Sequence, residues 1–311
     1  MARQWIVGSG NGRRAVLATA LTLTVATVAA CGQLPDGVDG ELTGGWTPLA
    51  EPVPFVPEAG VCHNRETTSG AMVDYIPIDC AQMHLLEIVH VGEFTGEHAA
   101  ADTAPEPGSA ARLAARAECD QRVTEFIGGS WRSGTLRLVV VTPSQQAWDG
   151  GARWLRCDLG ETQGTDFDNI IFRSVTLAGV LTDAESSVPL RCFDSASVAS
   201  DGELLVERVA CDAPHQSEFA GTYVEDKLSY QEVRSNADEV HRRCKTVVAG
   251  FAKVPDDGDL QYRVGTVYSY PGASDWADGD RTIRCYAWRA DPLLTRSVRG
   301  GGTSALPVQY A

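Results

Sequence analysis

Eight cysteines in two sets of four constrain the fold of this chain more than any other feature of its sequence. They lie at Cys62, Cys80, Cys119, Cys157, Cys192, Cys211, Cys244 and Cys285. Successive gaps are 18, 39 and 38 residues in the first set and 19, 33 and 41 residues in the second. The near match of the two sets indicates that a segment has been duplicated.

Short motifs recur between these cysteines in the same order. C-x3-H-x2-E begins at Cys80 and Cys211, C-x3-V-x2-F begins at Cys119 and Cys244, and P-x4-W-x7-R-C ends at Cys157 and Cys285. A Ser-Val pair closes each copy, at Ser174 and Val175 and again at Ser297 and Val298. The sequence therefore predicts two tandem copies of one domain, over residues 58–180 and 181–302, with a tail over 303–311.

Four cysteines in each copy predict two disulfides per copy, because small exported domains use them to stabilise a limited core. Zinc ligation is the alternative, but zinc sites usually place two ligands close together, and no such cysteine pair occurs here. We therefore expect no metal and no cofactor. Spacing leaves three pairings open within each copy. We favour the sequential one, which would clip a β-hairpin and then join the helix to the last strand.

The first thirty residues have the pattern of a lipoprotein signal peptide. Arg3, Arg13 and Arg14 precede an apolar run of the length of a signal sequence, which is short for a spanning helix. The run ends in Val-Ala-Ala-Cys31, which predicts a diacylglycerol on Cys31. A plain secretory signal or an uncleaved anchor is the alternative. Residues 31–57, rich in Pro, Gly and acids, are predicted to be a flexible tether.

The composition argues against nucleic acid as a partner. The formal charge is −15, and removing three arginines and no acid with the leader makes it −18. Nucleic acids and other polyanions are bound through positive potential, which this chain lacks. Solubility outside the cell is a sufficient reason for the negative charge. We expect the protein on the outer face of the cell membrane, held there by its lipid.

Hydrophobic periodicity predicts the same elements in both copies. Cys119, Val123 and Phe126 share one helix face, which predicts a helix over 110–127 and its counterpart over 237–252. Short β-rich runs predict strands at 85–94, 136–141 and 152–157, then at 218–224, 260–270 and 281–286. The expected fold class is α+β, with two small disulfide-stapled domains, each an antiparallel sheet packed by one helix.

Few residues suggest chemistry. One titratable pair is repeated, as His84 and Glu87 and again as His215 and Glu218. Each pair could act as metal ligands or as an acid and a base. In the structural alternative, each His ring binds nearby backbone and each Glu faces solvent or pairs with an Arg. Trp148 and Trp276 are expected either to line a ligand groove or to cover the core of their own copy. Arg156 and Arg284 should face outward and pair with surface carboxylates. No familiar catalytic motif is present, which predicts a protein that is not an enzyme.

These motifs resemble the septum-formation domain family of actinobacterial envelope proteins. The second copy has that family's Cys-Phe start, its C-x-x-P-H-x-x-E segment from Cys211 to Glu218 and its Trp-Gly-Cys ending. The first copy departs at His63, where the family has Phe, and at Met83, where it has Pro. The resemblance implies a role in the envelope or in cell division and carries no activity.

The expected function is thus a membrane-tethered, non-catalytic module that binds a protein of the envelope or the division machinery. A hydrolase or metal-dependent enzyme that uses the His-x-x-Glu pairs is the alternative, and it requires a convergent pocket with a third ligand. A small-ligand carrier is a third reading, and it requires a sizeable apolar pocket between the copies.

Overall fold

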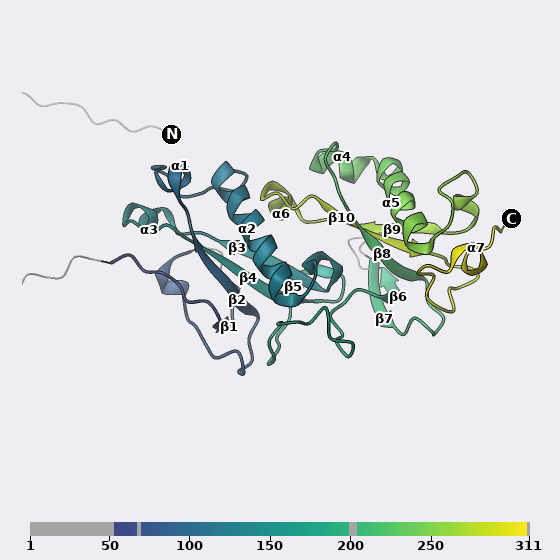
Figure 1. Cartoon of the computed structure of the whole chain (residues 1–311), viewed down its shortest axis with the longest axis horizontal. Coiled ribbons are helices and arrows are strands. Elements are labelled where there is room, and N and C mark those ends of the chain that lie inside the picture. The colour runs from purple at the N-terminus through teal and green to yellow at the C-terminus, as the bar shows by residue number, and fades with distance from the viewer. Residues whose placement is uncertain (1–52, 67–69, 199–203, 310–311) are drawn as a thin grey trace, which may run out of the picture. The chain divides into compact units, whose positions relative to one another are not determined.

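Two antiparallel sheets, each covered by one long helix, make up the computed structural model of the chain (Figure 1). It describes residues 53–66, 70–198 and 204–309. The predicted signal peptide, Cys31 and most of the predicted tether lie outside these residues. In the described part of the chain, no helix is long and apolar enough to cross a membrane.

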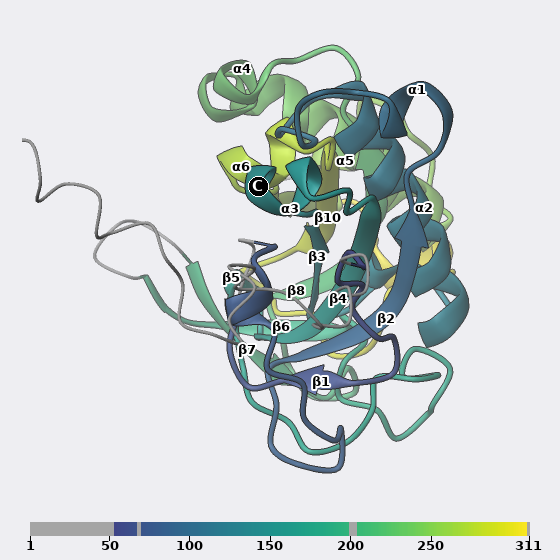
Figure 2. The same cartoon turned by 90° about the vertical axis from the view of Figure 1, so that its left-hand side faces the viewer.

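The first sheet has the strand order β1-β2-β4-β3, and a fifth strand pairs with β4. Its strands are β1 (Cys62–His63), β2 (Leu86–Glu93), β3 (Leu136–Val141), β4 (Trp154–Gln163) and β5 (Asp166–Ile170). Helix α2 (Ala110–Ile127) packs against β2, β3 and β4, as Figure 2 shows from the side. Two short helices, α1 (Gly96–Ala99) and α3 (Gln145–Asp149), lie in the connections.

The second sheet repeats this plan with the order β7-β6-β8-β10-β9. Its strands are β6 (Cys192–Val198), β7 (Leu204–Val209), β8 (Ser217–Val224), β9 (Gly265–Ser269) and β10 (Thr282–Trp288). Helix α5 (Ala237–Ala252) packs against β8, β9 and β10. The shorter helices are α4 (Tyr230–Ser235), α6 (Ala273–Ala277) and α7 (Gly302–Ala305). The α+β class predicted from the sequence is confirmed. We call residues 58–180 the first half and residues 181–302 the second half.

The four disulfides have the pairing that we favoured. Two of them join each long helix to a central strand, Cys119 to Cys157 and Cys244 to Cys285, and all four of these residues are fully buried. The outer disulfides join Cys62 to Cys80 and Cys192 to Cys211. The expected hairpin lies inside Cys192–Cys211 as β6 and β7, whereas the corresponding segment of the first half holds β1 and a 3-10 turn at Met72–Asp74.

Local sequence explains where the helices begin and end. The Ser109 hydroxyl accepts a hydrogen bond from the Arg112 N–H and caps α2. Gly128, at φ 81°, ends α2 in the left-handed conformation that glycine adopts without strain. Lys253 takes the same role after α5 at φ 60°, so a left-handed C-cap is common to both halves even without glycine.

One predicted strand is wrong in its first part. Residues 260–270 were expected to be one strand, but Leu260–Tyr262 is a 3-10 turn and β9 begins only at Gly265. The preceding Asp-Asp-Gly-Asp turn continues through Leu260, whose N–H donates to the Asp257 carbonyl. Leu260 is buried in the second core, so its burial does not require a strand.

Candidate functional site

Trp148 and Trp276 cover the cores of their own halves. Each lies on a short helix, α3 or α6, and is almost fully buried. Trp148 packs against Phe94, and its indole N–H donates to the Ala101 carbonyl at 2.7 Å. Neither tryptophan forms part of a ligand groove in the cavities described below.

His84 and His215 bind nearby backbone at the start of the central strands. The Nδ1 atom of His84 lies 2.8 Å from the Gln82 carbonyl oxygen, and that of His215 lies 2.8 Å from the Ala213 carbonyl oxygen. Both rings are fully buried. The backbone alternative that we raised for these histidines therefore describes their contacts.

That alternative also expected each Glu to face solvent or to pair with an arginine. Instead, Glu87 and Glu218 are buried and hydrogen-bond the end of their own half, although Glu87 lies in the field of Arg173. Glu87 accepts hydrogen bonds from the Thr176 hydroxyl and the Leu177 N–H, both at 2.8 Å. Glu218 accepts from the Ser297 hydroxyl and, at 2.7 Å, from the Val298 N–H. A buried carboxylate is tolerated where such donors replace its lost hydration.

These contacts correct the Ser-Val match read from the sequence. The structural counterpart of Ser297 and Val298 is Thr176 and Leu177, two residues beyond Ser174 and Val175. The backbone pairing agrees, because His84 pairs with Arg173 and His215 pairs with Leu294 three residues before each hydroxyl residue. What the two halves share at this point is a hydroxyl followed by a buried apolar residue, Leu177 or Val298.

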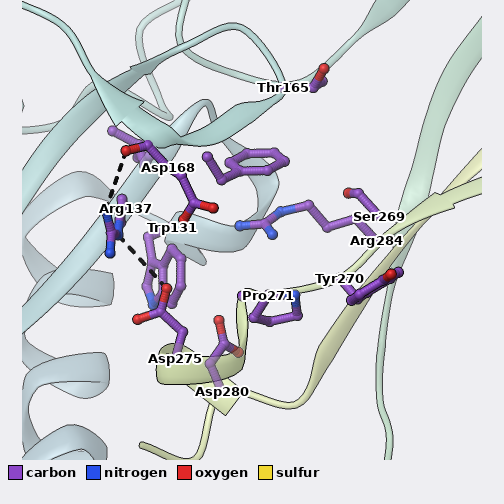
Figure 3. Close-up of a pocket in the computed structure, with 13 residues that line it drawn as sticks. Trp131, Arg137, Thr165, Asp168, Ser269, Tyr270, Pro271, Asp275, Asp280 and Arg284 are labelled. Atoms are coloured by element: carbon purple, nitrogen blue, oxygen red, sulfur yellow. Dashed lines mark hydrogen bonds and ion pairs between the residues drawn. The ribbon is translucent and has the colours of Figure 1, made fainter. Parts of the chain in front are cut away.

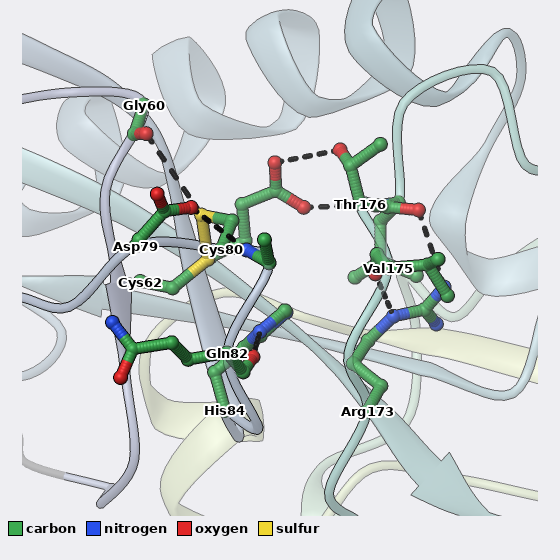
Figure 4. Close-up of a disulfide and its surroundings, with 12 residues drawn as sticks. Gly60, Cys62, Asp79, Cys80, Gln82, His84, Arg173, Val175 and Thr176 are labelled. Atoms are coloured by element: carbon green, nitrogen blue, oxygen red, sulfur yellow. Dashed lines mark hydrogen bonds between the residues drawn. A yellow bond between two sulfur atoms is a disulfide. The ribbon is translucent and has the colours of Figure 1, made fainter.

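The repeated His and Glu converge on a disulfide. One ligand atom from each of Cys62, His84 and Glu87 lies within 4.8 Å of the others, and Cys192, His215 and Glu218 form the same cluster. Figure 4 shows the disulfide and His84 of the first cluster, together with Thr176, which binds Glu87. The sulfur in each cluster is bonded to a second sulfur, and all six residues are buried.

Arg156 and Arg284 contradict the expectation that they pair with surface carboxylates. Both point away from their own helix, but both are about 2% exposed because other segments cover that face. Arg156 makes a two-pronged ion pair with Asp158, which is fully buried. Arg284 reaches into the first half, where its Nε donates to the Arg132 carbonyl and its guanidinium lies 3.8 Å from the Phe167 ring centroid.

A group of buried charges joins the two halves. Arginines of the first half meet aspartates of the second: Arg112 with Asp278 at 2.9 Å, Arg132 with Asp280 at 3.0 Å, Arg116 with Asp280 at 3.5 Å and Arg137 with Asp275 at 3.7 Å. Burial acts to raise the pKa of Asp280, but the surrounding guanidinium groups, Arg132 first, hold this pKa below its usual range. The carboxylate is therefore charged and tightly held.

These charges belong to the joint and are absent from the shared motif. Alignment on the two tryptophans puts Asp275, Asp278 and Asp280 opposite three small residues, Ala147, Gly150 and Ala152. Alignment on the helix cysteines puts Arg112 and Arg116 opposite Ala237 and His241. The two halves thus differ at these positions, and each supplies a different surface to the contact.

A cavity of about 140 Å³ lies beside this joint and is lined by both halves (Figure 3). Trp131, Phe167 and Tyr270 supply aromatic surface, and Asp168 and Asp275 supply carboxylates nearer to solvent. We call these five residues the joint pocket. Arg137, which also lines the cavity, is held by Glu66, by the Asp168 carbonyl and by Asp275. Its mixed lining differs from the apolar pocket that a carrier would need.

A second, neighbouring cavity of about 290 Å³ extends the same joint. It lies against α2 and the end of β3 and is lined by Pro105, Arg112, Arg116, Val140, Ser274 and Asp278 among others. Its arginines bind the carboxylates of the joint, Arg112 to Asp278 and Arg116 to Asp280.

The first half also buries a titratable layer behind its sheet. Burial, together with the positive charge of Arg156, lowers the pKa of His63 to about 4. Burial raises the pKa of Asp158 to about 6, even though Arg156 opposes the shift. In the second half the corresponding residues are Phe193 and Tyr286, which make a ring contact at 6.0 Å.

These two shifts predict opposite effects of pH on stability. Between pH 4 and 6.5 His63 binds fewer protons in the folded than in the unfolded chain, so its contribution to stability rises with pH. Asp158 binds more protons in the folded than in the unfolded chain, so its contribution to stability falls with pH. We expect near cancellation in the native protein. In His63→Phe the free energy of unfolding should fall by about 1–2 kcal/mol between pH 4 and 6.5, because only the Asp158 effect remains. In Asp158→Asn the free energy of unfolding should rise over the same range. Urea unfolding at several pH values measures the free energy of unfolding of each variant. Equal dependence of this free energy on pH in the two variants would contradict this account.

The residues of the joint pocket were missed by sequence reasoning. Only Arg284 attracted notice there, and its outward direction from its own core was the available signal. A pattern of spacing reports on which face of an element is buried, whereas Phe167 and Asp275 line one cavity because the two halves come together.

Comparison with known proteins places the sequence in one family. The model of the family described as "Septum formation" matches residues 59–286, a single match that includes strands of both sheets. No curated protein and no solved structure matches the chain. Because the match is continuous, the prediction that each half is by itself a copy of the family domain stays a prediction.

Proposed function

The chain belongs to the septum-formation family, and from this premise we propose that it is a membrane-tethered, non-catalytic binding module of the cell envelope that serves septum formation or cell division. In this proposal a diacylglycerol on Cys31 holds the protein at the outer face of the membrane. Its partner is a protein of the envelope or of the division machinery, bound at the joint pocket.

The cysteines support the compartment. Four disulfides fit a protein that works outside the cytoplasm, where thiols are not kept reduced. A role in the envelope or in cell division follows from the family itself. The lipid anchor rests on the Val-Ala-Ala-Cys31 pattern alone.

The joint pocket carries the proposal of binding. It combines aromatic faces, one of which Arg284 already covers, with the exposed Asp168 and with the half-buried Asp275, which also pairs with Arg137. Aromatic faces and carboxylates together attract a cationic side chain, through the ring quadrupole and through charge. The negative charge of the whole chain also favours a basic partner. We therefore infer that an Arg or Lys side chain of the partner enters this pocket.

The repeated His and Glu support a non-catalytic role. Glu87 and Glu218 use both oxygens to hold the ends of their halves, and His84 and His215 are fully buried. A substrate would have to displace these structural contacts to reach the imidazoles. The alternative of a hydrolase or metal-dependent enzyme has in its favour the convergence of His, Glu and a sulfur in each half.

Photo-crosslinking in cells tests the proposed function. A photoreactive residue in place of Thr165, which lines the pocket, should give a crosslink to a protein. The yield should fall at least about tenfold when Asp168→Asn and Asp275→Asn are added, because each change removes a charge that attracts the cation. The same residue in place of the exposed Glu185 should give no such product.

The crosslinking results can support or contradict the proposal. A protein crosslink that depends on the two aspartates supports the proposal. Crosslinks to cell-wall glycan, or protein crosslinks of equal yield with and without the aspartates, contradict binding of a basic protein segment at this pocket.

A further inference from the structure

Each half contains the same unassigned cluster of a cysteine, a histidine and a glutamate, independent of the joint pocket. The ligand atoms of Cys62, His84 and Glu87 lie within 4.8 Å of one another, as do those of their counterparts in the second half. All three residues are at least nine-tenths buried in both halves. Structural histidines are common, but His84 and His215 also have a buried ring nitrogen without a hydrogen-bond partner.

The imidazoles make the backbone contact that metal-binding histidines usually make. A backbone carbonyl only accepts, so in the neutral imidazole the contact of His84 with the Gln82 carbonyl places the proton on Nδ1 and the lone pair on Nε2. That Nε2 atom is buried without a hydrogen-bond partner, and Nε2 of His215 is in the same state. Metal-binding histidines typically donate their other N–H to a carbonyl in this way.

The carboxylates are also held in place. Glu87 is fixed by the Thr176 hydroxyl and the Leu177 N–H, and each of its oxygens retains a further lone pair. Hydrogen bonds that orient a ligating carboxylate in this way strengthen a metal site. Glu218 has the matching pair of bonds in the second half.

The sulfur is the ligand that depends on redox state. In the disulfide, Cys62 is not a thiolate, and the thiolate is the form that binds metal. The outer disulfides have one partly exposed member each, Cys80 and Cys211, whereas both members of each inner disulfide are fully buried. An external thiol attacks where it has access, so it should reduce the outer pair first.

We propose that reduction of the two outer disulfides creates one zinc-type metal site in each half. Cys62, His84 and Glu87 are the buried ligands of the first site, Cys192, His215 and Glu218 are those of the second, and Cys80 or Cys211 supplies a fourth. The reductant is a dithiol, which gives two electrons and two protons to each disulfide and is itself oxidised to a disulfide. Zn²⁺ then displaces the proton of each thiol that it binds. Two thiolates, one imidazole and one carboxylate suit its tetrahedral preference.

Metal titration of the full chain tests this inference. After limited reduction by a dithiol and its removal, Co²⁺ should bind at two per chain, with tetrahedral and thiolate absorption bands, and Zn²⁺ should displace it. The oxidised chain should bind none. His84→Ala and His215→Ala should each remove one equivalent, while His98→Ala, in α1, should retain both.

A second variant removes the need for a reductant. Cys80→Ser with Cys211→Ser leaves Cys62 and Cys192 as free thiols while the inner disulfides keep the fold stapled. This variant should bind two Co²⁺ with one thiolate each, and Glu87→Gln should weaken the first site at least about tenfold. Retention of both equivalents without the two histidines, or no binding by either the reduced chain or this variant, would overturn the proposal.

Discussion

Asp280→Ala should be among the most destabilising single changes in the chain, at about 3–5 kcal/mol, because it leaves buried arginines without their carboxylate. Asp280 is about 2% exposed and pairs with Arg132 and Arg116, and it also lies in the field of Arg284. Breaking one side of a buried ion pair costs more than the pair contributes, because the remaining charge stays desolvated. Urea unfolding of the purified protein measures the loss.

A surface ion pair supplies the matched control. Asp226 pairs with Arg243 at 3.3 Å but is 69% exposed, so Asp226→Ala should cost no more than about 1 kcal/mol. Asp280→Asn keeps the shape and an acceptor oxygen, and it should fall between the two. Equal losses for the Asp226 and Asp280 variants would show that the joint does not depend on its buried charge.

Removal of the Cys119–Cys157 disulfide should cost about 4 kcal/mol, since its cysteines lie 38 residues apart and it restricts the unfolded chain accordingly. Both sulfurs are also fully buried in the first core, so Cys119→Ala with Cys157→Ala removes packing as well. Loss of contact between α2 and β4 should appear as a lower urea midpoint.

The outer disulfide of the same half is the comparison. Cys62→Ala with Cys80→Ala opens a span of 18 residues, for which the same chain-entropy estimate gives about 3 kcal/mol. Cys80 is partly exposed, so less packing is lost there. A larger loss for the outer pair than for the inner pair would contradict the view that the helix–strand staple dominates.

Local sequence patterns predicted the long helices and several strands of both halves correctly. The predicted helices over 110–127 and 237–252 match α2 and α5, and the predicted strand over 136–141 matches β3. These segments succeeded because their periodicity reflects one buried face against a sheet. Leu260 was misread as part of a strand because its burial comes from a turn that packs into the core.

The candidate site was less predictable for a physical reason. His84 and Glu87 could be singled out because they recur, and the contact of His84 with the Gln82 carbonyl is local. The contact of Glu87 with Thr176, however, joins residues 89 positions apart that no spacing rule connects. The joint pocket depends on how the two halves meet. Arg284 and Phe167 are far apart in sequence, and neither has a local pattern that indicates the other.

The central claim is that the joint pocket binds a basic side chain, and an NMR titration tests it most directly. The probes are two tripeptides, Gly-Arg-Gly and Gly-Glu-Gly, both with blocked termini. We expect Gly-Arg-Gly to shift amide signals of Phe167 and Asp168 in the first half together with Tyr270 and Asp275 in the second, and Asp275→Asn to weaken this effect. Shifts confined to one half, scattered over the surface, or equal for Gly-Glu-Gly would contradict the claim.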